Sequence, residues 1–327
     1  MPHDAITDVA GVRVGHCTVR RDPDVRTGVT VVLPPELPLF AGAHRLNGNG
    51  ELTGLEWVRE SGLLTSAIGL TNTHSVGVVR DALVEAAIRE GTDRWHLPVV
   101  GETWDGFLND INGMHVTREH VFAALEAAGD GPVEQGCVGS GTGMVCHGFK
   151  GGIGSASRRA GEFVVGVLVQ ANHGRRARLV VDGVPVGREL GPDAVPLPGA
   201  PEGAGSIIVI VATDAPLLPH QCERVAQRAA LGVARTGGAG ENSSGDLMLC
   251  FSTANRGLGA SEGTIAAEFL PNDAIDELFY ATIEATEAAI VNALLAAETT
   301  TGREGRVVHA LPRDRFEELV RAPARNG

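Results

Sequence analysis

A glycine-rich segment, residues 237–246, carries the side chains best suited to covalent chemistry. It reads Gly-Gly-Ala-Gly-Glu-Asn-Ser-Ser-Gly-Asp and places Ser244 just before an apolar run. A serine hydroxyl is a weak nucleophile until a base takes its proton. Cleavage of the bond between Ser243 and Ser244 would free an α-amine with an ordinary pKa of ~7.7–8.0, which suits that role near neutral pH. The Ser244 hydroxyl can make the cut itself by attacking the Ser243 carbonyl. Taken alone, however, a Ser-Ser-Gly-Asp sequence in a glycine-rich segment is more often a plain turn than a nucleophile.

The elements around this segment are expected to form layers of strands and helices. Continuous apolar runs at residues 206–212 and 247–251 predict strands that are covered on both faces. Residues 162–172 and 177–186, joined by residues 173–176, have the pattern of a β-hairpin. Apolar residues at helical spacing predict four helices, over residues 75–90, 117–128, 219–235 and 273–297. Because there is no regular strand–helix alternation, the order favours an α+β layered sandwich over a doubly wound parallel sheet. We expect a single domain over residues 1–327.

Composition excludes several classes of function. The 327 residues carry a net charge of −13 and show no Lys/Arg cluster of the kind that neutralises phosphates, so no nucleic-acid partner is expected. No apolar run approaches the ~18–20 residues of a membrane span. Five scattered cysteines without Cys/His zinc spacing indicate free thiols in a reducing compartment. We therefore expect a cytoplasmic protein with no membrane partner, no metal and no organic cofactor.

Residues 236–256 resemble the processing site of the L-aminopeptidase D-esterase (DmpA) family of self-cleaving N-terminal-nucleophile hydrolases, which includes β-aminopeptidases. Other blocks resemble the same family and extend over nearly the whole chain: residues 11–16, 102–112, 139–154, 212–217, 285–287 and 306–314. The resemblance implies a four-layer αββα sandwich and cleavage into an α chain, residues 1–243, and a β chain, residues 244–327. It also implies small amine-bearing substrates and a homo-oligomer, a tetramer or larger.

The resemblance also assigns roles downstream and upstream of Ser244. A second hydroxyl and a carboxylate two residues apart match Thr282 and Glu284, with threonine where we expect serine. Residues two apart on a regular helix point to nearly opposite faces, so either the helix is interrupted near Ala281 or only one of the pair reaches Ser244. Asn172, at the end of a predicted strand, would stabilise an oxyanion. Lys150 would orient that amide or lower the pKa of the nucleophile's amine.

Two further residues are candidates for binding substrate. The resemblance implies that Glu134 holds the ammonium group of the substrate. His147 stands where we expect tyrosine, and it is equally compatible with a packing residue.

These observations favour hydrolysis of an amide or ester next to a free amino group, through an acyl-enzyme on Ser244. One alternative is an acyltransferase of the ornithine-acetyltransferase type, although such enzymes use threonine as the nucleophile. The other is an uncleaved, non-enzymatic homologue.

Overall fold

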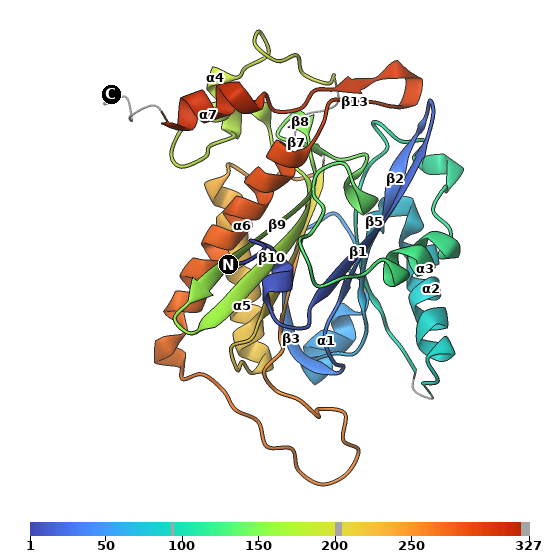
Figure 1. Ribbon diagram of the computed structural model, residues 1–327, viewed down its shortest axis with the longest axis vertical. Coiled ribbons are helices and arrows are strands. Elements are labelled where there is room, and N and C mark those ends of the chain that lie inside the picture. Colours follow the sequence, from blue (N-terminus) through green and yellow to red (C-terminus); the bar gives the residue numbers. More distant parts are fainter. Residues whose placement is uncertain (93–94, 200–204, 322–327) are drawn as a thin grey trace.

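Two β-sheets lie face to face between two layers of helices in the computed structural model, which describes residues 1–92, 95–199 and 205–321 (Figure 1). The first sheet has the strand order β1-β2-β5-β6. Its strands are β1 Arg13–Arg21, β2 Val25–Leu33, β5 Ile68–Asn72 and β6 Val99–Thr103. Strands β5 and β6 are parallel, and the other pairs are antiparallel.

The second sheet has the strand order β4-β3-β12-β11-β10-β9. Its strands are β3 Leu39–Gly48, β4 Leu63–Leu64, β9 Gly152–Ala160, β10 Phe163–Asn172, β11 Ser206–Thr213 and β12 Gly245–Ser252. Strand β12 lies parallel to β11 and antiparallel to β3, so it is held on both edges.

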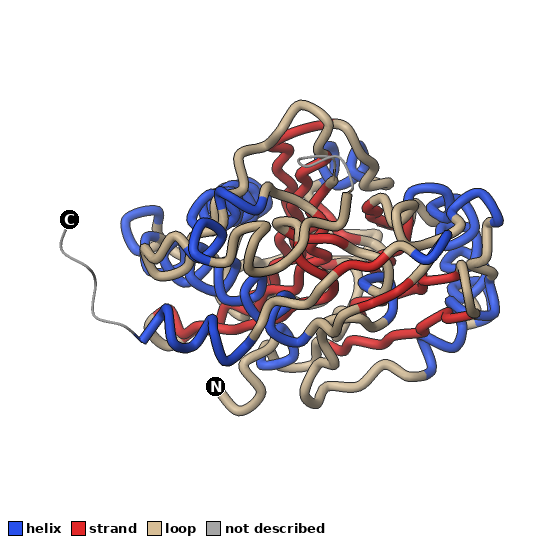
Figure 2. Tube along the Cα trace, turned by 90° about the horizontal axis from the view of Figure 1, so that it is seen from above, coloured by secondary structure: helices blue, strands red, loops and turns tan. Residues whose placement is uncertain are grey.

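Helices cover the outer face of each sheet. Helices α2 Val76–Arg89 and α3 Arg118–Glu126 pack on the first sheet, and α5 Pro219–Arg235 and α6 Asp276–Ala296 pack on the second. Seen from above, the strands lie between these helices (Figure 2). The remaining elements are α1 Leu55–Ser61, α4 Val186–Glu189, α7 Arg313–Arg321 and two small hairpins, β7 Val145–Cys146 with β8 Phe149–Lys150 and β13 Thr300–Thr301 with β14 Val307–Val308. The αββα sandwich expected from the sequence is confirmed.

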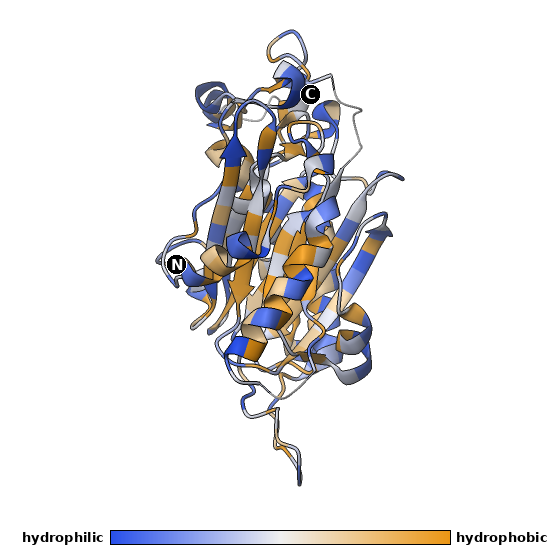
Figure 3. Ribbon diagram, turned by 90° about the vertical axis from the view of Figure 1, so that its right-hand side faces the viewer, coloured by the Kyte–Doolittle hydropathy of each residue, from blue (hydrophilic) through white to orange (hydrophobic). Residues whose placement is uncertain are grey.

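The central strands are apolar on both faces because each face meets a different layer. In β11, Ile207 and Val209 belong to the core beneath α5 and α6, whereas Ile208 and Ile210 belong to the core between the sheets. This alternation with a period of two is the geometry of a strand, and burial of both faces explains the continuous apolar run. Figure 3 shows the hydrophobic residues concentrated along these inner strands.

Helix α6 lies directly on the backbone of β9. A Cβ atom added to Gly154 would be 1.9 Å from the carbonyl oxygen of Ala289. By length and composition α6 could cross a membrane. However, 61% of its apolar 18-residue stretch is buried inside the molecule, where the helix packs against β9, β10 and α5. Its apolar character therefore serves the core.

The predicted helices and buried strands are confirmed, with ends shifted by up to three residues, but the predicted hairpin is wrong. Strand β10 pairs with β9 and β11, and residues 177–186 contain a 3₁₀ turn and the start of α4 instead of a strand. The cause is Arg176, which is fully buried. Its guanidinium donates hydrogen bonds to the carbonyl oxygens of Gly148, Leu190 and Val195, and this holds the segment in an irregular path.

Candidate active site

Ser244 lies at the entrance to β12, the third strand of the six-stranded sheet. Only 2% of the residue is exposed, and its hydroxyl donates a 2.6 Å hydrogen bond to Oδ1 of Asp246. The backbone N–H of Ser244 donates to the carbonyl oxygen of Glu241 at 2.8 Å. The strand thus fixes a serine hydroxyl against a carboxylate within one short segment.

Asp246 has the protonation behaviour of a general base. Burial raises the pKa of its carboxyl to about 6, and the charge of Glu241 adds to that effect while the hydrogen bond from Ser244 opposes it. Near pH 7 the group is therefore mostly ionised, yet its pKa is close enough to neutrality for it to accept a proton effectively.

The carbonyl that precedes Ser244 is also held by a side chain. Asn49 donates from Nδ2 to the carbonyl oxygen of Ser243 at 2.7 Å, and Asn47 donates to the carbonyl oxygen of Glu241 at 2.6 Å. Asn47 lies near the end of β3, which is paired with β12, and Asn49 follows that strand. A hydrogen bond to a carbonyl oxygen stabilises the negative charge that develops there under nucleophilic attack. Sequence reasoning missed Asn49, although its place in a polar, glycine-rich segment after a strand was a usable signal.

A second carboxylate, Glu102 at the end of β6, comes from the other sheet. The residue is 2% exposed, and its side chain accepts hydrogen bonds from the backbone N–H of Glu51 at 3.0 Å and from the hydroxyl of Thr73. A Cβ atom added to Gly50 would lie 3.0 Å from Oε1 of Glu102 and 3.2 Å from Cα of Gly245. Glu102 therefore lies beside the residue that follows Ser244, and burial raises the pKa of its carboxyl. The sequence placed Glu102 in a family block but gave it no role.

The close packing here depends on glycine at position 245. A Cβ atom at that position would be 2.5 Å from the carbonyl oxygen of Asn49, which is shorter than any real contact of this kind. The N–H of Gly245 donates to the hydroxyl of Ser206 at 3.0 Å. Absence of a side chain thus lets the segment after β3 approach the nucleophile.

Asn172 is brought to the same end of the sheet. It pairs with Ser206, which contacts Gly245, so it lies two strands away from the nucleophile. Its Oδ1 accepts a hydrogen bond from the N–H of Val145 at 2.7 Å, and its Nδ2 donates to the carbonyl oxygen of Trp104 at 2.9 Å. The amide is firmly oriented, and its second Nδ2 hydrogen is not used in these contacts.

In the described part of the chain, Lys150 makes no direct hydrogen bond to the Asn172 amide, which was one of the two roles considered for it from the sequence. Its ammonium is fully buried and donates to the carbonyl oxygens of Gly141 and Gly151 at 3.1 and 2.9 Å. Burial lowers the pKa of this group. The backbone of Val145, which pairs with Lys150 across the β7–β8 hairpin, holds Asn172 instead.

Thr282 and Glu284 are not brought to Ser244. Helix α6 runs without interruption from Asp276 to Ala296, so the two side chains leave it on different faces. Thr282 is fully buried and donates its hydroxyl to the carbonyl oxygen of Leu278 at 2.6 Å, whereas Glu284 is exposed. In the described part of the chain, neither hydrogen-bonds to Ser244 or Asp246. The helix could not turn both side chains toward one point.

In the part of the chain that the structure describes, neither of the two expected substrate-binding residues hydrogen-bonds to Ser244 or Asp246. Glu134 is exposed, in the segment that meets β9 through the bridge between Gly136 and Ile153. His147 is fully buried, and its ring packs against that of His173.

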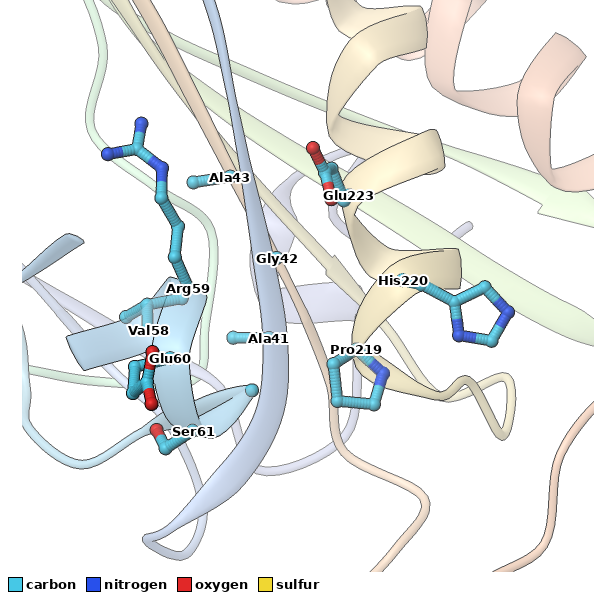
Figure 4. Close-up of a pocket in the computed structure, with 11 residues that line it drawn as sticks. Ala41, Gly42, Ala43, Val58, Arg59, Glu60, Ser61, Pro219, His220 and Glu223 are labelled. Carbon is cyan, nitrogen blue, oxygen red and sulfur yellow. The ribbon is translucent and has the colours of Figure 1, made fainter. Parts of the chain in front are cut away.

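A pocket elsewhere on the molecule is not part of this site. It lies between α1, β3 and the first turn of α5 and is lined by Ala41, Gly42, Arg59, Pro219 and Glu223, among others (Figure 4). Ala41 pairs with Phe251, near the far end of β12 from Gly245. At about 3.3 Å per strand residue, the pocket is on the order of 20 Å from Ser244.

Comparisons with known proteins show which family the chain belongs to. The model of "Peptidase family S58" matches residues 4–308. The β-peptidyl aminopeptidase BapA of Sphingosinicella microcystinivorans is 46% identical over 98% of this chain and 88% of its own length. Among solved structures, a Burkholderia sp. β-aminopeptidase has 52% identity and a TM-score of 0.93, covering 99% of this chain and 95% of that one.

A third relative identifies the fold class. The L-aminopeptidase D-Ala-esterase/amidase of Ochrobactrum anthropi is described as a prototype for the serine aminopeptidases and a variant of the N-terminal-nucleophile hydrolase fold. It has 40% identity and a TM-score of 0.89, covering 98% of this chain and 94% of that one. The chain therefore belongs to peptidase family S58, as an aminopeptidase with the N-terminal-nucleophile hydrolase fold.

Proposed function

We propose that the chain is a precursor that cuts its own bond between Ser243 and Ser244 and then acts as an aminopeptidase with Ser244 as its N-terminal nucleophile. In the first step Asp246 takes the hydroxyl proton of Ser244, and Oγ attacks the carbonyl carbon of Ser243. The C–N bond breaks as the nitrogen takes up a proton, leaving an ester between Ser243 and Ser244. Water then opens the ester to give a free Ser243 carboxylate and a free Ser244 hydroxyl and amine.

The observation that carries this proposal is the pair of hydrogen bonds on either side of the scissile bond. Asp246 accepts from the attacking hydroxyl at 2.6 Å, and Asn49 donates to the carbonyl oxygen under attack at 2.7 Å. A base on the nucleophile and a donor on the electrophile are the two parts that acyl transfer to serine requires. A plain turn requires neither.

After cleavage, the same hydroxyl would attack the carbonyl of a substrate. The free α-amine of Ser244, with an ordinary pKa of ~7.7–8.0, would take the hydroxyl proton and deliver it to the leaving amine. Asn172 would donate its unused Nδ2 hydrogen to the oxyanion. Water would then hydrolyse the acyl-enzyme, and Thr282 and Glu284 have no part in this scheme.

We further propose that Glu102 holds the ammonium group of the substrate. It is a buried carboxylate beside Gly245, so it can pair with a cation only a short distance from the nucleophile. Amides and esters of short amine-terminated molecules are then the substrate class. The names of the relatives at 46% and 52% identity favour a β-amino acid at the N-terminus.

Self-cleavage is tested by a time course on a denaturing gel. Two fragments, with N-terminal sequencing of the smaller one starting at Ser244, are expected, and Ser244→Ala should remain one band. Persistence of the full-length chain on incubation, in a preparation whose circular dichroism shows it to be folded, would refute the proposal.

The substrate class is tested with matched anilides of a β-amino acid, its α-amino isomer and its N-acetylated form. Hydrolysis of the first two and not of the third is expected. In Glu102→Gln, KM for the free-amine substrates should rise more than kcat falls, because the pairing exists before the reaction begins. Equal KM values in the wild type and the variant would remove Glu102 from this role.

We also propose that the protein is a homo-oligomer, a tetramer or larger. Large apolar side chains remain exposed on the single chain, among them Phe269 at 58% and Tyr280 at 58%. The long loop between β12 and α6 extends away from the body of the molecule (Figure 1). Light scattering coupled to gel filtration measures the mass, and a monomer at micromolar concentration would contradict this expectation.

A further inference from the structure

Three side chains with metal-binding atoms meet next to Asn172 and Val145, and in the described part of the chain none of the three hydrogen-bonds to Ser244. Cys146 ends β7, His147 follows it, and His173 follows the last residue of β10. All three are buried, and one ligand atom from each lies within 4.8 Å of the other two. Cys146 Sγ is 3.8 Å from Nδ1 of His173, and the two imidazole rings lie edge to face at 5.1 Å.

In each of the two imidazole rings, one nitrogen has no hydrogen-bond partner among the described residues. His147 Nδ1 is 3.2 Å from the carbonyl oxygen of Arg175, and since a carbonyl only accepts, this nitrogen carries the proton. Nε2 of His147 therefore presents a lone pair. Among the described residues, Nε2 of His147 and Nε2 of His173 are buried without a hydrogen-bond partner. Buried polar atoms in proteins usually have a partner, so two buried nitrogens without one indicate that this place can receive a ligand.

We propose that Cys146, His147 and His173 bind one soft d¹⁰ cation, and that Cu⁺ fits the site better than Zn²⁺. Thiolate and imidazole are the ligands that such ions prefer. With metal–sulfur and metal–nitrogen bonds of about 2.3 and 2.0 Å, ligand atoms lie about 3.5 Å apart. The present spacing of up to 4.8 Å therefore needs an adjustment of about 1 Å. On binding, the ion replaces the thiol proton of Cys146, which passes to solvent, and no electron is transferred.

The surrounding charge and the number of ligands favour the monovalent ion. The buried guanidinium of Arg176 donates to the carbonyl oxygen of His147 at 3.1 Å, and the ammonium of Lys150 acts electrostatically on Cys146. Zn²⁺ with one thiolate would leave a net positive charge beside these cations, whereas Cu⁺ with one thiolate is neutral. Structural Zn²⁺ also takes four ligands, whereas one thiolate and two imidazoles complete a trigonal Cu⁺ site.

The backbone holds the ligands in place before any ion arrives. His147 has φ +49°, a conformation that non-glycine residues seldom adopt, and its N–H donates to the carbonyl oxygen of His173 at 2.7 Å. Gly174 lets the chain pass close to the ring, because a Cβ atom there would be 2.3 Å from His147. The carbonyl of Arg175 on Nδ1 is the kind of outer contact that orients a ligating imidazole.

The test is an anaerobic titration of the reduced full-length protein with Cu⁺, supplied in competition with bicinchoninate at pH 7.5. One equivalent per chain is expected to be withdrawn from the competitor, and Cys146→Ser and His147→Phe should each weaken that binding at least 100-fold. Cys222→Ser is the matched control, because Cys222 is also a buried thiol but lies in α5, and it should bind like the wild type. A parallel titration with Zn²⁺ should show weaker binding, and tighter binding of Zn²⁺ would overturn the choice of ion.

X-ray absorption at the copper edge of the loaded wild type keeps the proposal falsifiable even if a variant fails to fold. One sulfur and two imidazole nitrogens around copper are expected. Two sulfurs would assign the ion to the neighbouring thiols Cys222 and Cys250 and overturn the proposal. Failure of the wild type to bind Cu⁺ against the competitor would do the same.

Discussion

Replacing Asp246 with asparagine should slow self-cleavage more than any other change that leaves Ser244 in place. The amide keeps the size of the side chain and can still hydrogen-bond to the hydroxyl that now lies 2.6 Å away, but it cannot take the proton. A positioned general base contributes about 10²- to 10⁴-fold to a rate. A precursor that matures in minutes should therefore need hours to days.

The pH dependence gives a second measure of the same group. Because the pKa of Asp246 is about 6, the cleavage rate should be half its plateau value near pH 6. At pH 5 about one carboxyl in eleven is ionised, so the rate should fall roughly tenfold below the plateau, and by a further tenfold for each lower unit. The rate should be nearly constant above pH 7 as far as this group is concerned.

Precursor made in a short pulse of cell-free translation can be shifted into buffers from pH 5 to pH 8 and sampled on denaturing gels. Glu241→Gln is the matched control, since the charge of Glu241 helps to raise the pKa of Asp246 and its removal should move the midpoint to lower pH. A flat profile over this range, or Asp246→Asn cleaving at the wild-type rate, would show that another base does the work and refute the reasoning.

Three further predictions concern the cleavage site, the packing of α6 and a buried acid. Asn49→Ala should slow self-cleavage by about 10²- to 10³-fold while the chain stays folded, as gels and circular dichroism can show; wild-type cleavage would remove Asn49 from the mechanism. Gly154→Ala should destabilise the protein by several kcal/mol in denaturant melts, because its Cβ would meet α6 at 1.9 Å. Gly77→Ala is the control: its Cβ would have nothing within 4 Å, and it should raise the stability by about 0.5 kcal/mol. Equal effects of the two variants would contradict the close approach of α6 to Gly154. Burial raises the pKa of Asp105 from its ordinary 3.8 to about 7, so its contribution to stability is greatest in acid and is lost as the pH rises to 7. The free energy of unfolding of the wild type relative to Asp105→Asn should therefore fall by about 2–3 kcal/mol between pH 5 and pH 8. A constant difference would exclude the shift.

The sequence predicted those parts of the fold that depend on local pattern. The buried strand around Ile208 and the helix beginning at Pro219 follow from periods of two and 3.6 residues. A hairpin was wrongly predicted after Asn172. The irregular path of this segment depends on hydrogen bonds from Arg176 to carbonyl groups elsewhere in the chain, which local sequence does not show. Local composition does not tell whether an arginine in such a segment is buried or lies in a solvated turn.

Of the residues in the proposed site, the sequence predicted Ser244, just before β12, and Asn172, at the end of β10. Ser244 and Asp246 are two residues apart in the sequence and remain together in the fold. Asn49 follows β3 and Glu102 lies in β6 of the other sheet, so their spacing in the sequence does not show that both lie near Ser244. Likewise, His173 joins Cys146 only because β10 returns to the hairpin before β9, which is why the sequence shows no metal-binding motif.

The position of β12 has a consequence for how the two products of cleavage would behave. This strand enters the sheet between β3 and β11, and both neighbours belong to the longer piece. Once the bond before Ser244 is cut, the shorter piece is interleaved with the longer one and cannot leave without breaking two ladders and exposing the face of α6. An affinity tag on either piece should therefore recover both from the same column. The two fragments would therefore need no association step in solution, because they would fold as one chain before the cleavage.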